Sequence, residues 1–343
     1  MCTLSLALTV LLWQWQWQPT FREGSHPTKI TLPVASTGPY KIHRTVSSVC
    51  SEVTNGNVVN RTRLDLWKRA NKVPAEADTS ERLRNDVRDC QELKRQHGYY
   101  RWPVTPQEES FPLAFSFKIH RAPGLFEHLL RVLWRPHNLY VIHVDKKAPS
   151  DVFKLIKDLA TCFDNIVVIE TRVNVVYASI LSLLADIECV KVALKSSIRW
   201  RYHLNLCGQE FPLRTNLELV QILSLMNGSI DVENYSPTQT LITSLTYKRE
   251  IRHGTNVITS VKRTPFWHPK VEIRKGSAYN TVTREFLEWV LMDRVSQDLL
   301  LWLSDTWAPD ELFWATASYL PGAPGGVRAI IRHRAQTHLS RYR

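Results

Sequence analysis

The residues from Leu139 to Val144 form a short apolar run that ends abruptly in Asp145. A run of this kind is typical of a strand that is buried on both faces of a parallel sheet. Asp145, Lys146 and Lys147 then follow at the carboxyl end of that strand, where open α/β sheets bind nucleotides. The run therefore predicts an α/β fold with a ligand site beside Asp145.

Strand-like and helical segments alternate from Leu113 onward. Strands are predicted at 113–119, 139–144, 166–169, 202–206 and 277–282, and helices at 124–134, 152–162, 177–194, 217–226 and 284–291. Short apolar strands separated by helices are typical of a parallel α/β sheet. Residues 227–274 contain three prolines and are predicted to form one long irregular loop, which in a compact domain is usually functional or mobile.

The composition limits the domain organisation. The chain has 343 residues, of which 44% are hydrophobic, and its 12 Trp favour a packed core over global disorder. Residues 1–17 begin with an apolar, uncharged stretch and are predicted to be a signal anchor or a cleaved signal peptide. Residues 18–110 are polar and are predicted to form a stem whose far end packs on a domain at 111–330. A basic tail, 331–343, completes the chain.

The formal net charge of +12 suits a nucleic acid, an anionic membrane or an anionic small substrate such as a nucleotide sugar. A nucleic-acid-binding protein is expected to interleave aromatic and basic residues, but the basic tail offers only Tyr342, so no nucleic-acid partner is expected. Asn-X-Ser/Thr patterns begin at Asn60, Asn227 and Asn234. Together with the apolar amino terminus they favour a glycosylated, lumenal protein.

Several well-known chemical signatures are absent from the sequence. There is no Walker loop, G-x-G-x-x-G, H-E-x-x-H, G-x-S-x-G or D-x-D motif, and the nearest relative of D-x-D is Asp231-Val232-Glu233 in the predicted loop. A metal-dependent mechanism is therefore disfavoured, and Lys, Arg or backbone donors would have to meet the charge of a leaving diphosphate. No C-x-x-C occurs among the six cysteines, which leaves buried thiols or a secretory disulfide set.

Five positions carry candidate chemistry. Asp310 and Glu311 open a helix after a proline, where one carboxylate is a candidate general base, although both would also complement the helix dipole. Asp145 and His120 end predicted strands, where each could line a nucleotide or simply serve the turn. Cys207 closes a strand without a placed His partner and is interpreted as an inert thiol. The Trp residues at 267, 289, 302, 307 and 314 are expected in the core.

Five blocks occur in order between residues 113 and 330: FKIHRAPGLFEHLLRVLWRPHNLYVIHVDKKAP, VVYASILSLLADIEC, NLCGQEFPLRTN, KGSAYNTVTREF and SDTWAPDELFWAT. Together they resemble the core 2 and I-branching family of β-1,6-N-acetylglucosaminyltransferases. The resemblance implies a GT-A fold and inverting, metal-independent transfer of N-acetylglucosamine from UDP-GlcNAc, with no cofactor. The acceptor would be the 6-hydroxyl of a galactose or GalNAc in O-glycans or poly-lactosamine. It also implies a type II protein of the Golgi membrane with a lumenal catalytic domain.

The resemblance assigns roles to single residues. Glu311 matches the general base that deprotonates the acceptor hydroxyl. Asp145, His120 and Tyr177 match residues that line the uridine nucleotide, and Glu233 matches a carboxylate that holds the acceptor galactoside.

The cysteines are assigned in the same way. Cys90 and Cys162 match a paired position of the family and are expected to form a disulfide. Cys50 is expected to lack its partner. Cys189 is expected to be free, because its family partner falls at Val141.

The resemblance fades after Ile330, whereas the family continues with a segment that holds an Arg and a Lys for the UDP diphosphate. The Lys and Arg that the family has shortly after the Glu233 position are also missing from residues 240–246. The chain is thus expected to be a divergent, carboxyl-terminally truncated member. Two functions remain open: a β-1,6-N-acetylglucosaminyltransferase, or a catalytically inactive relative that binds a glycan or a partner. UDP binding would distinguish them.

Overall fold

The computed structural model describes Thr62 and residues 77–236, 238 and 245–326. The chain divides into two compact units, residues 1–75 with 342–343, and residues 76–341. Apart from Thr62, the described residues belong to the second unit. The predicted anchor at 1–17, the basic tail, Cys50 and Asn60 lie outside the described residues. No helix in the described part of the chain is both long and apolar enough to span a bilayer.

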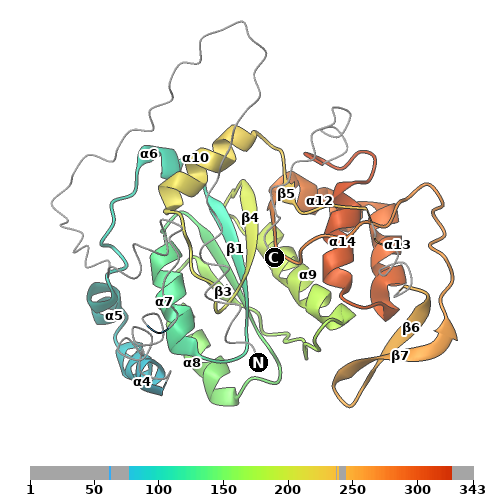
Figure 1. Cartoon of the computed structure of the whole chain (residues 1–343). Coiled ribbons are helices and arrows are strands. Elements are labelled where there is room, and N and C mark those ends of the chain that lie inside the picture. Colours follow the sequence, from blue (N-terminus) through green and yellow to red (C-terminus); the bar gives the residue numbers. More distant parts are fainter. Residues whose placement is uncertain (1–61, 63–76, 237, 239–244, 327–343) are drawn as a thin grey trace, which may run out of the picture. The chain divides into compact units, whose positions relative to one another are not determined.

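A six-stranded sheet with the order β3-β2-β1-β4-β8-β5 forms the centre of this unit (Figure 1). Its strands are β1 (Leu113–Ile119), β2 (Leu139–Val144), β3 (Ile166–Val168), β4 (Tyr202–Cys207), β5 (Asp231–Val232) and β8 (Asn280–Thr283). β1 to β4 run parallel, and β8 runs antiparallel to both of its neighbours. The predicted α/β fold with a mostly parallel, GT-A-like sheet is confirmed.

The pleat of the central strands explains why two layers of helices cover the sheet. Phe115, Phe117 and Tyr140 point into one hydrophobic cluster, whereas Ala114 and Val141 point into another, because successive side chains of a strand face opposite sides. The first cluster contains residues of α7 (Pro123–Leu133), α8 (Ser150–Ala160) and α10 (Asn216–Met226). The second contains residues of α9 (Ile180–Lys195), α12 (Arg284–Met292), α13 (Arg294–Trp302), η1 (Leu303–Asp305) and α14 (Pro309–Ser318).

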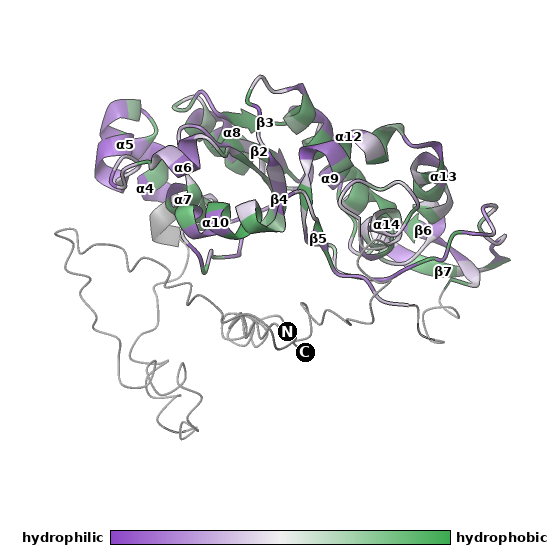
Figure 2. Ribbon diagram, turned by 90° about the horizontal axis from the view of Figure 1, so that it is seen from above, coloured by the Kyte–Doolittle hydropathy of each residue, from purple (hydrophilic) through white to green (hydrophobic). Residues whose placement is uncertain are grey.

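Three short helices, α4 (Ala77–Asp86), α5 (Cys90–His97) and α6 (Pro106–Glu109), come from the far end of the predicted stem. Leu83 and Leu93 are buried in the first hydrophobic cluster, although α5 is otherwise mostly hydrophilic (Figure 2). The Cys90–Cys162 disulfide that the resemblance implied ties the start of α5 to the segment after α8. Cys189 is a free, buried thiol, as expected.

The prediction of one irregular loop over 227–274 is wrong. The segment contains β5 and a hairpin of β6 (Tyr247–Arg252) and β7 (Thr255–Lys262), which turns through His253 and Gly254 in left-handed conformations. Most residues of both hairpin strands are exposed or half-buried, so neither strand needs the apolar alternation that normally reveals a strand. The turn is of the kind that closes two-residue hairpins.

Candidate active site

The carboxyl ends of β1, β2 and β4 lie in register along one edge of the sheet, which we call the carboxyl edge. Asp145 follows β2 there, and its N–H donates to the carbonyl of Ile119 at 2.8 Å. Its Oδ1 accepts the N–H groups of Lys147 at 2.9 Å and Val175 at 3.4 Å. Within the described residues Oδ2 accepts no hydrogen bond and lies 3.9 Å from Lys147 Nζ. The backbone therefore fixes one oxygen and leaves the other available to a ligand.

The other two residues expected to line a nucleotide also lie at this edge. His120 follows β1 and is exposed. Tyr177 comes two residues after Val175, and its side chain is 83% exposed. Its ring meets Trp307 edge to face, with centroids 5.9 Å apart. The expectation that Trp307 belongs to the core is wrong, because its residue is 37% exposed. Trp267 is likewise exposed.

Two left-handed residues join the loop before α9 to the loop before α14. Ala178 has φ of 52° and Ala308 has φ of 47°, and the N–H of Ala308 donates to the carbonyl of Ala178 at 2.9 Å. The side-chain amide of Asn256, from β7, donates to the same carbonyl and to that of Thr306 at 3.2 Å. An aromatic residue precedes each alanine, so this junction holds the backbone beside Tyr177 to the backbone beside Trp307.

Glu311 lies in the first turn of α14, three residues after this junction. Its side chain is 38% exposed, and Oε2 forms an ion pair with Lys275. Within the described part of the chain Oε1 accepts no hydrogen bond, so it is available to a ligand hydroxyl. Asp310 differs from it, because that residue is buried and its Oδ2 accepts a hydrogen bond from Ser182 at 2.9 Å. Of the two carboxylates, Glu311 is therefore the one that a substrate can reach.

Gly276 brings the segment of Glu233 next to Glu311. A Cβ on Gly276 would lie 1.8 Å from the carbonyl oxygen of Glu233, so no larger residue fits without movement of the backbone. The N–H of Gly276 also donates to the carbonyl of Glu311 at 2.8 Å. Lys275 pairs through its backbone with Tyr235. The two carboxylates that were expected to serve the acceptor thus come from adjacent backbone segments.

Sequence reasoning missed a buried polar network between the carboxyl edge and α14. Lys118 Nζ, from β1, donates to Asp186 at 2.7 Å and to Ser182 at 3.3 Å, and Ser182 in turn donates to Asp310. Burial opposes the charged form of Lys118, but the neighbouring carboxylates of Asp186 and Asp310 raise the pKa of its ammonium. Lys118 is a charged residue in an apolar strand, and Asp186 is a charged residue in an apolar helix. Opposite charges at two such buried positions are the only sequence signal that could have predicted the network, because buried charges are normally paired.

A second polar group lies where β4 ends. The N–H of Cys207 donates to Glu210 Oε2 at 3.0 Å. Burial raises the pKa of Glu210 to about 6. Burial also raises the pKa of the Cys207 thiol, which fits the interpretation of Cys207 as an unreactive thiol. A Cβ on the next residue, Gly208, would lie 2.4 Å from a methyl group of Ile119, so β1 and the loop after β4 approach closely.

The Asn234 glycosylation pattern conflicts with the structure. The Asn234 amide donates to the carbonyl of Ala315 and to Ser318 Oγ, and its oxygen accepts from Arg274. An amide with these three bonds is not free to carry a glycan. Asn227 is exposed at the carboxyl end of α10.

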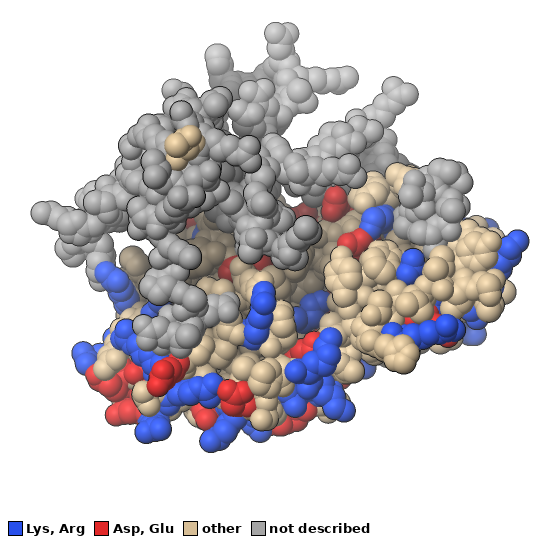
Figure 3. Space-filling model, turned by 60° about the horizontal axis from the view of Figure 1, so that its bottom comes forward, with Lys and Arg blue, Asp and Glu red and all other residues tan. Residues whose placement is uncertain are grey.

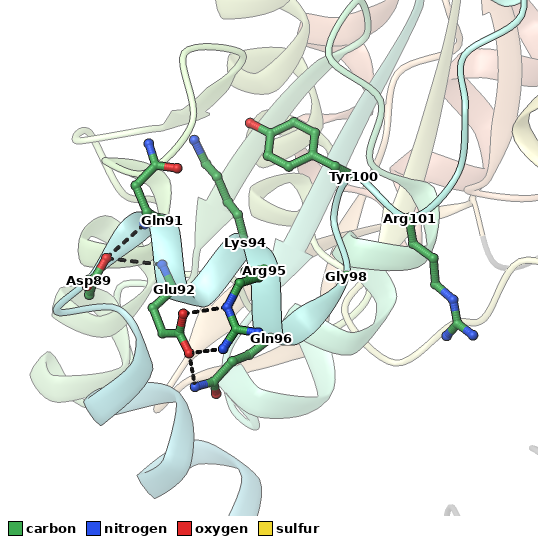
Figure 4. A pocket seen from close by; sticks show the side chains of 9 residues that line it. All are labelled: Asp89, Gln91, Glu92, Lys94, Arg95, Gln96, Gly98, Tyr100 and Arg101. Atoms are coloured by element: carbon green, nitrogen blue, oxygen red, sulfur yellow. Dashed lines mark hydrogen bonds and ion pairs between the residues drawn. The ribbon is translucent and has the colours of Figure 1, made fainter.

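A metal site or a surface hollow could offer a further place for a ligand. Among the described residues no three His, Cys, Asp or Glu side chains lie close enough together to hold a metal ion. A hollow of about 690 Å³ lies along α5, where Glu92 and Arg95 pair with each other (Figure 4). Its lining contains none of the candidate residues, so it is separate from the site described above.

Comparison with known proteins gives a family. Residues 113–338 match the family described as "Core-2/I-Branching enzyme". The chain belongs to this family. It is 34% identical over 278 residues to the human β-1,3-galactosyl-O-glycosyl-glycoprotein β-1,6-N-acetylglucosaminyltransferase 3, with 81% of this chain and 63% of that protein covered. The sheep protein of the same name gives the same identity over 281 residues, with the same coverage. A zebrafish enzyme numbered 4 gives 34% over 250 residues, covering 71% of this chain and 58% of the enzyme.

The chain thus spans about 63% of the length of the human and sheep relatives. Among solved structures, a 4-diphosphocytidyl-2C-methyl-D-erythritol synthase from Anaerococcus prevotii covers 58% of this chain at 13% identity, with a TM-score of 0.29, and 85% of its own chain is covered. In this Core-2/I-branching member, the described residues include every position to which the sequence assigned a donor, acceptor or base role.

Proposed function

We propose that this protein transfers N-acetylglucosamine from UDP-GlcNAc to the 6-hydroxyl of a galactose or GalNAc in an O-glycan or poly-lactosamine, with inversion and without a metal ion. The observation that carries the proposal is the position of Glu311. It presents a carboxylate oxygen that accepts no hydrogen bond from the described residues, on a helix whose N-cap residue, Ala308, donates to the carbonyl of Ala178. The names of the relatives at 34% identity support the same reaction.

The acceptor hydroxyl is a poor nucleophile until a base takes its proton. In the proposed reaction Oε1 of Glu311 accepts that proton while the hydroxyl oxygen forms a bond to the anomeric carbon of the donor sugar. The bond between that carbon and the diphosphate oxygen breaks, and its electron pair leaves with UDP. Lys275 keeps Oε2 in place and so directs Oε1 towards the acceptor. Glu233, on the neighbouring segment, is proposed to hold the acceptor sugar.

The uridine end of the donor is assigned to the carboxyl edge. Oδ2 of Asp145 can accept a hydrogen bond from a ribose hydroxyl or a base N–H, and Tyr177, two residues after the Val175 that bonds to Asp145, offers an exposed aromatic ring. Negative charge that develops on the diphosphate needs positive charge in return, and without a metal ion it must come from Lys, Arg or backbone N–H groups.

The proposed location is the lumenal side of the Golgi membrane. A disulfide such as Cys90–Cys162 persists in oxidising compartments of the secretory pathway. We propose residues 1–17 as the signal anchor of a type II protein. On the lower left of the face shown in Figure 3, Lys and Arg lie among Asp and Glu and do not form one continuous basic stripe of the kind that a nucleic acid would bind.

The test is a transfer assay with the full 343-residue chain. The chain is incubated with labelled UDP-GlcNAc and a galactosyl or core 1 acceptor, with and without EDTA, and the product linkage is determined. A β-1,6-linked product formed equally in both conditions supports the proposal. Absence of both UDP binding and transfer would instead favour the inactive, glycan- or partner-binding relative, and UDP binding without transfer to any of these acceptors would contradict the proposed reaction.

A further inference from the structure

Most of the cationic side chains around the proposed base already have an anionic partner. Lys118 pairs with Asp186 at 2.7 Å, Arg263 pairs with Asp305 at 2.7 Å, and Lys275 pairs with Glu311. Each of these cations is therefore neutralised before any ligand arrives. They cannot supply uncompensated positive charge to a diphosphate without breaking an existing pair.

Arg249, on β6, is an exception. Within the described residues its guanidinium forms no ion pair, and its only hydrogen bond runs from Nη1 to the carbonyl of Asn256 at 3.3 Å. Its Nε is buried and has no hydrogen-bond partner. Arg249 as a whole is half-buried, so the rest of its guanidinium keeps N–H groups that no anion in the described residues occupies and that a ligand can use.

An aromatic ring holds the guanidinium in a fixed position. The Cζ atom of Arg249 lies 4.5 Å from the centroid of the Trp307 ring, a distance typical of a cation–π contact. The backbone on which Trp307 stands is held in turn by the Asn256 side-chain amide, which donates to the carbonyls of Ala178 and Thr306. The backbone carbonyl of Asn256 also accepts the hydrogen bond from Arg249 Nη1. Asn256 therefore contacts both the guanidinium and the backbone next to the Trp307 ring.

The position of Arg249 is continuous with the carboxyl edge. Trp307 contacts Tyr177 edge to face, and Tyr177 is two residues from Val175, whose N–H donates to Asp145. On its other side Trp307 precedes the helix that carries Glu311 by two residues. Arg249 is therefore linked through the Trp307 ring both to Tyr177, which is assigned to the uridine site, and to the segment that enters the helix of the proposed base.

We propose that Arg249 binds the diphosphate of the donor, with Tyr177 and Trp307 as the wall along which the donor lies. This assignment rests on the proposed function. A planar guanidinium with free N–H groups can bind two phosphate oxygens at once, and its charge stays in place as the diphosphate becomes the leaving group. The hairpin of β6 and β7 thereby contributes to donor binding, although no motif marks it in the sequence.

The test compares UDP with uridine, since only UDP carries the phosphates. Affinities are measured by isothermal titration on the full chain and on Arg249→Gln, Arg249→Lys and the control Lys262→Gln. Lys262 is an exposed cation of the same hairpin. Arg249→Gln is expected to weaken UDP binding roughly tenfold to a hundredfold and to leave uridine binding unchanged, because a charge-assisted hydrogen bond is lost. The UDP affinity of Arg249→Lys should lie between those of the wild type and Arg249→Gln, and that of Lys262→Gln should match the wild type.

The outcomes separate the two proposals. If wild-type protein binds UDP and Arg249→Gln binds it equally well, the assignment of Arg249 is overturned while the proposed function stands. A variant Lys146→Gln tests the exposed cation after β2. A loss of UDP affinity in Lys146→Gln but not in Arg249→Gln would assign the diphosphate to that turn instead. Absence of UDP binding by the wild type would overturn both proposals. Equal unfolding temperatures exclude misfolding as the cause of a loss.

Discussion

The two sides of the candidate site are built in different ways. On the side of β1, β2 and β4, the functional positions follow buried parallel strands that lie in register, so the backbone alone brings His120 and Asp145 to one edge. On the side of residues 227–326, the sheet is antiparallel and single contacts between distant residues set the geometry. Gly276 against Glu233 and Asn256 against Ala178 are two of these contacts.

This difference explains where single substitutions should act. On the parallel side, β1, β2 and β4 are held in register by strand pairing that repeats along their whole length, so the loss of one contact at the carboxyl edge should leave that register in place. The carboxyl-terminal side depends on a few contacts without substitutes, so one added methyl group or one lost amide should displace the base or the aromatic wall. The following predictions test that contrast.

Glu311→Gln should have the largest effect on the reaction. Turnover is expected to fall by about a hundredfold or more, because an amide cannot take the proton of the acceptor hydroxyl. Donor affinity should remain unchanged, since Glu311 belongs to the acceptor side of the site. Initial rates at saturating UDP-GlcNAc give the measurement.

The control for Glu311→Gln is Glu285→Gln. Glu285 is also a carboxylate in the first turn of a helix, α12, and it is exposed. If the role of Glu311 were only to complement the helix dipole, both variants would lose less than about 1 kcal/mol of stability and keep normal turnover. An active Glu311→Gln enzyme would end the assignment of the base.

A pair of glycine substitutions compares the two sides directly. Gly276→Ala places a methyl group 1.8 Å from the backbone oxygen of Glu233, whereas Gly208→Ala places it 2.4 Å from the Cγ2 methyl of Ile119, a side-chain atom whose displacement does not require the backbone to move. We expect Gly276→Ala to cost about 3 kcal/mol of unfolding free energy and Gly208→Ala about 1 kcal/mol. Chemical denaturation at one pH measures both. Equal costs would mean that the two sides do not differ in tolerance.

Glu210→Gln should have the smallest effect on stability of the variants considered. Glu210 follows β4, the strand that pairs with the parallel β1 on one side and with the antiparallel β8 on the other. Burial raises the pKa of Glu210 to about 6 in the folded protein, above its ordinary value of 4.5. A raised pKa means that the folded state prefers the protonated form. The contribution to stability is therefore present below pH 4.5 and is lost as the pH rises through 6.

The penalty above pH 6 amounts to at most about 2 kcal/mol, and to less once the partial exposure of the residue is considered. Glu210→Gln removes it, so the variant should be about 1 kcal/mol more stable than wild type at pH 7.5 and equal to it at pH 4.5. Unfolding free energies at the two pH values test this. A difference that stays the same at both would show that the charge of Glu210 is not its cause.

The same contrast decides what could be predicted from the sequence. The parallel strands can be recognised in the sequence as apolar runs. The predicted bounds agree with the observed ones for the strands 113–119 and 139–144. The hairpin was missed because its strands have no buried face to impose a pattern. Glu311 could be proposed from its helix start and the family resemblance. Lys275 and Arg249 could not, because their roles depend on contacts between residues far apart in the chain.

The proposed roles of Asp145 in donor binding and of Glu311 as the base can be tested most directly by UDP titration of Asp145→Asn and Glu311→Gln. Asn keeps an oxygen for the N–H groups of Lys147 and Val175 but puts an amide NH2 group in the place of Oδ2, the atom proposed to accept a hydrogen bond from the nucleotide. We predict that Asp145→Asn weakens UDP binding by about tenfold or more. Glu311→Gln should bind UDP like the wild type. Unchanged affinity in Asp145→Asn, or a comparable loss in Glu311→Gln, would contradict the account.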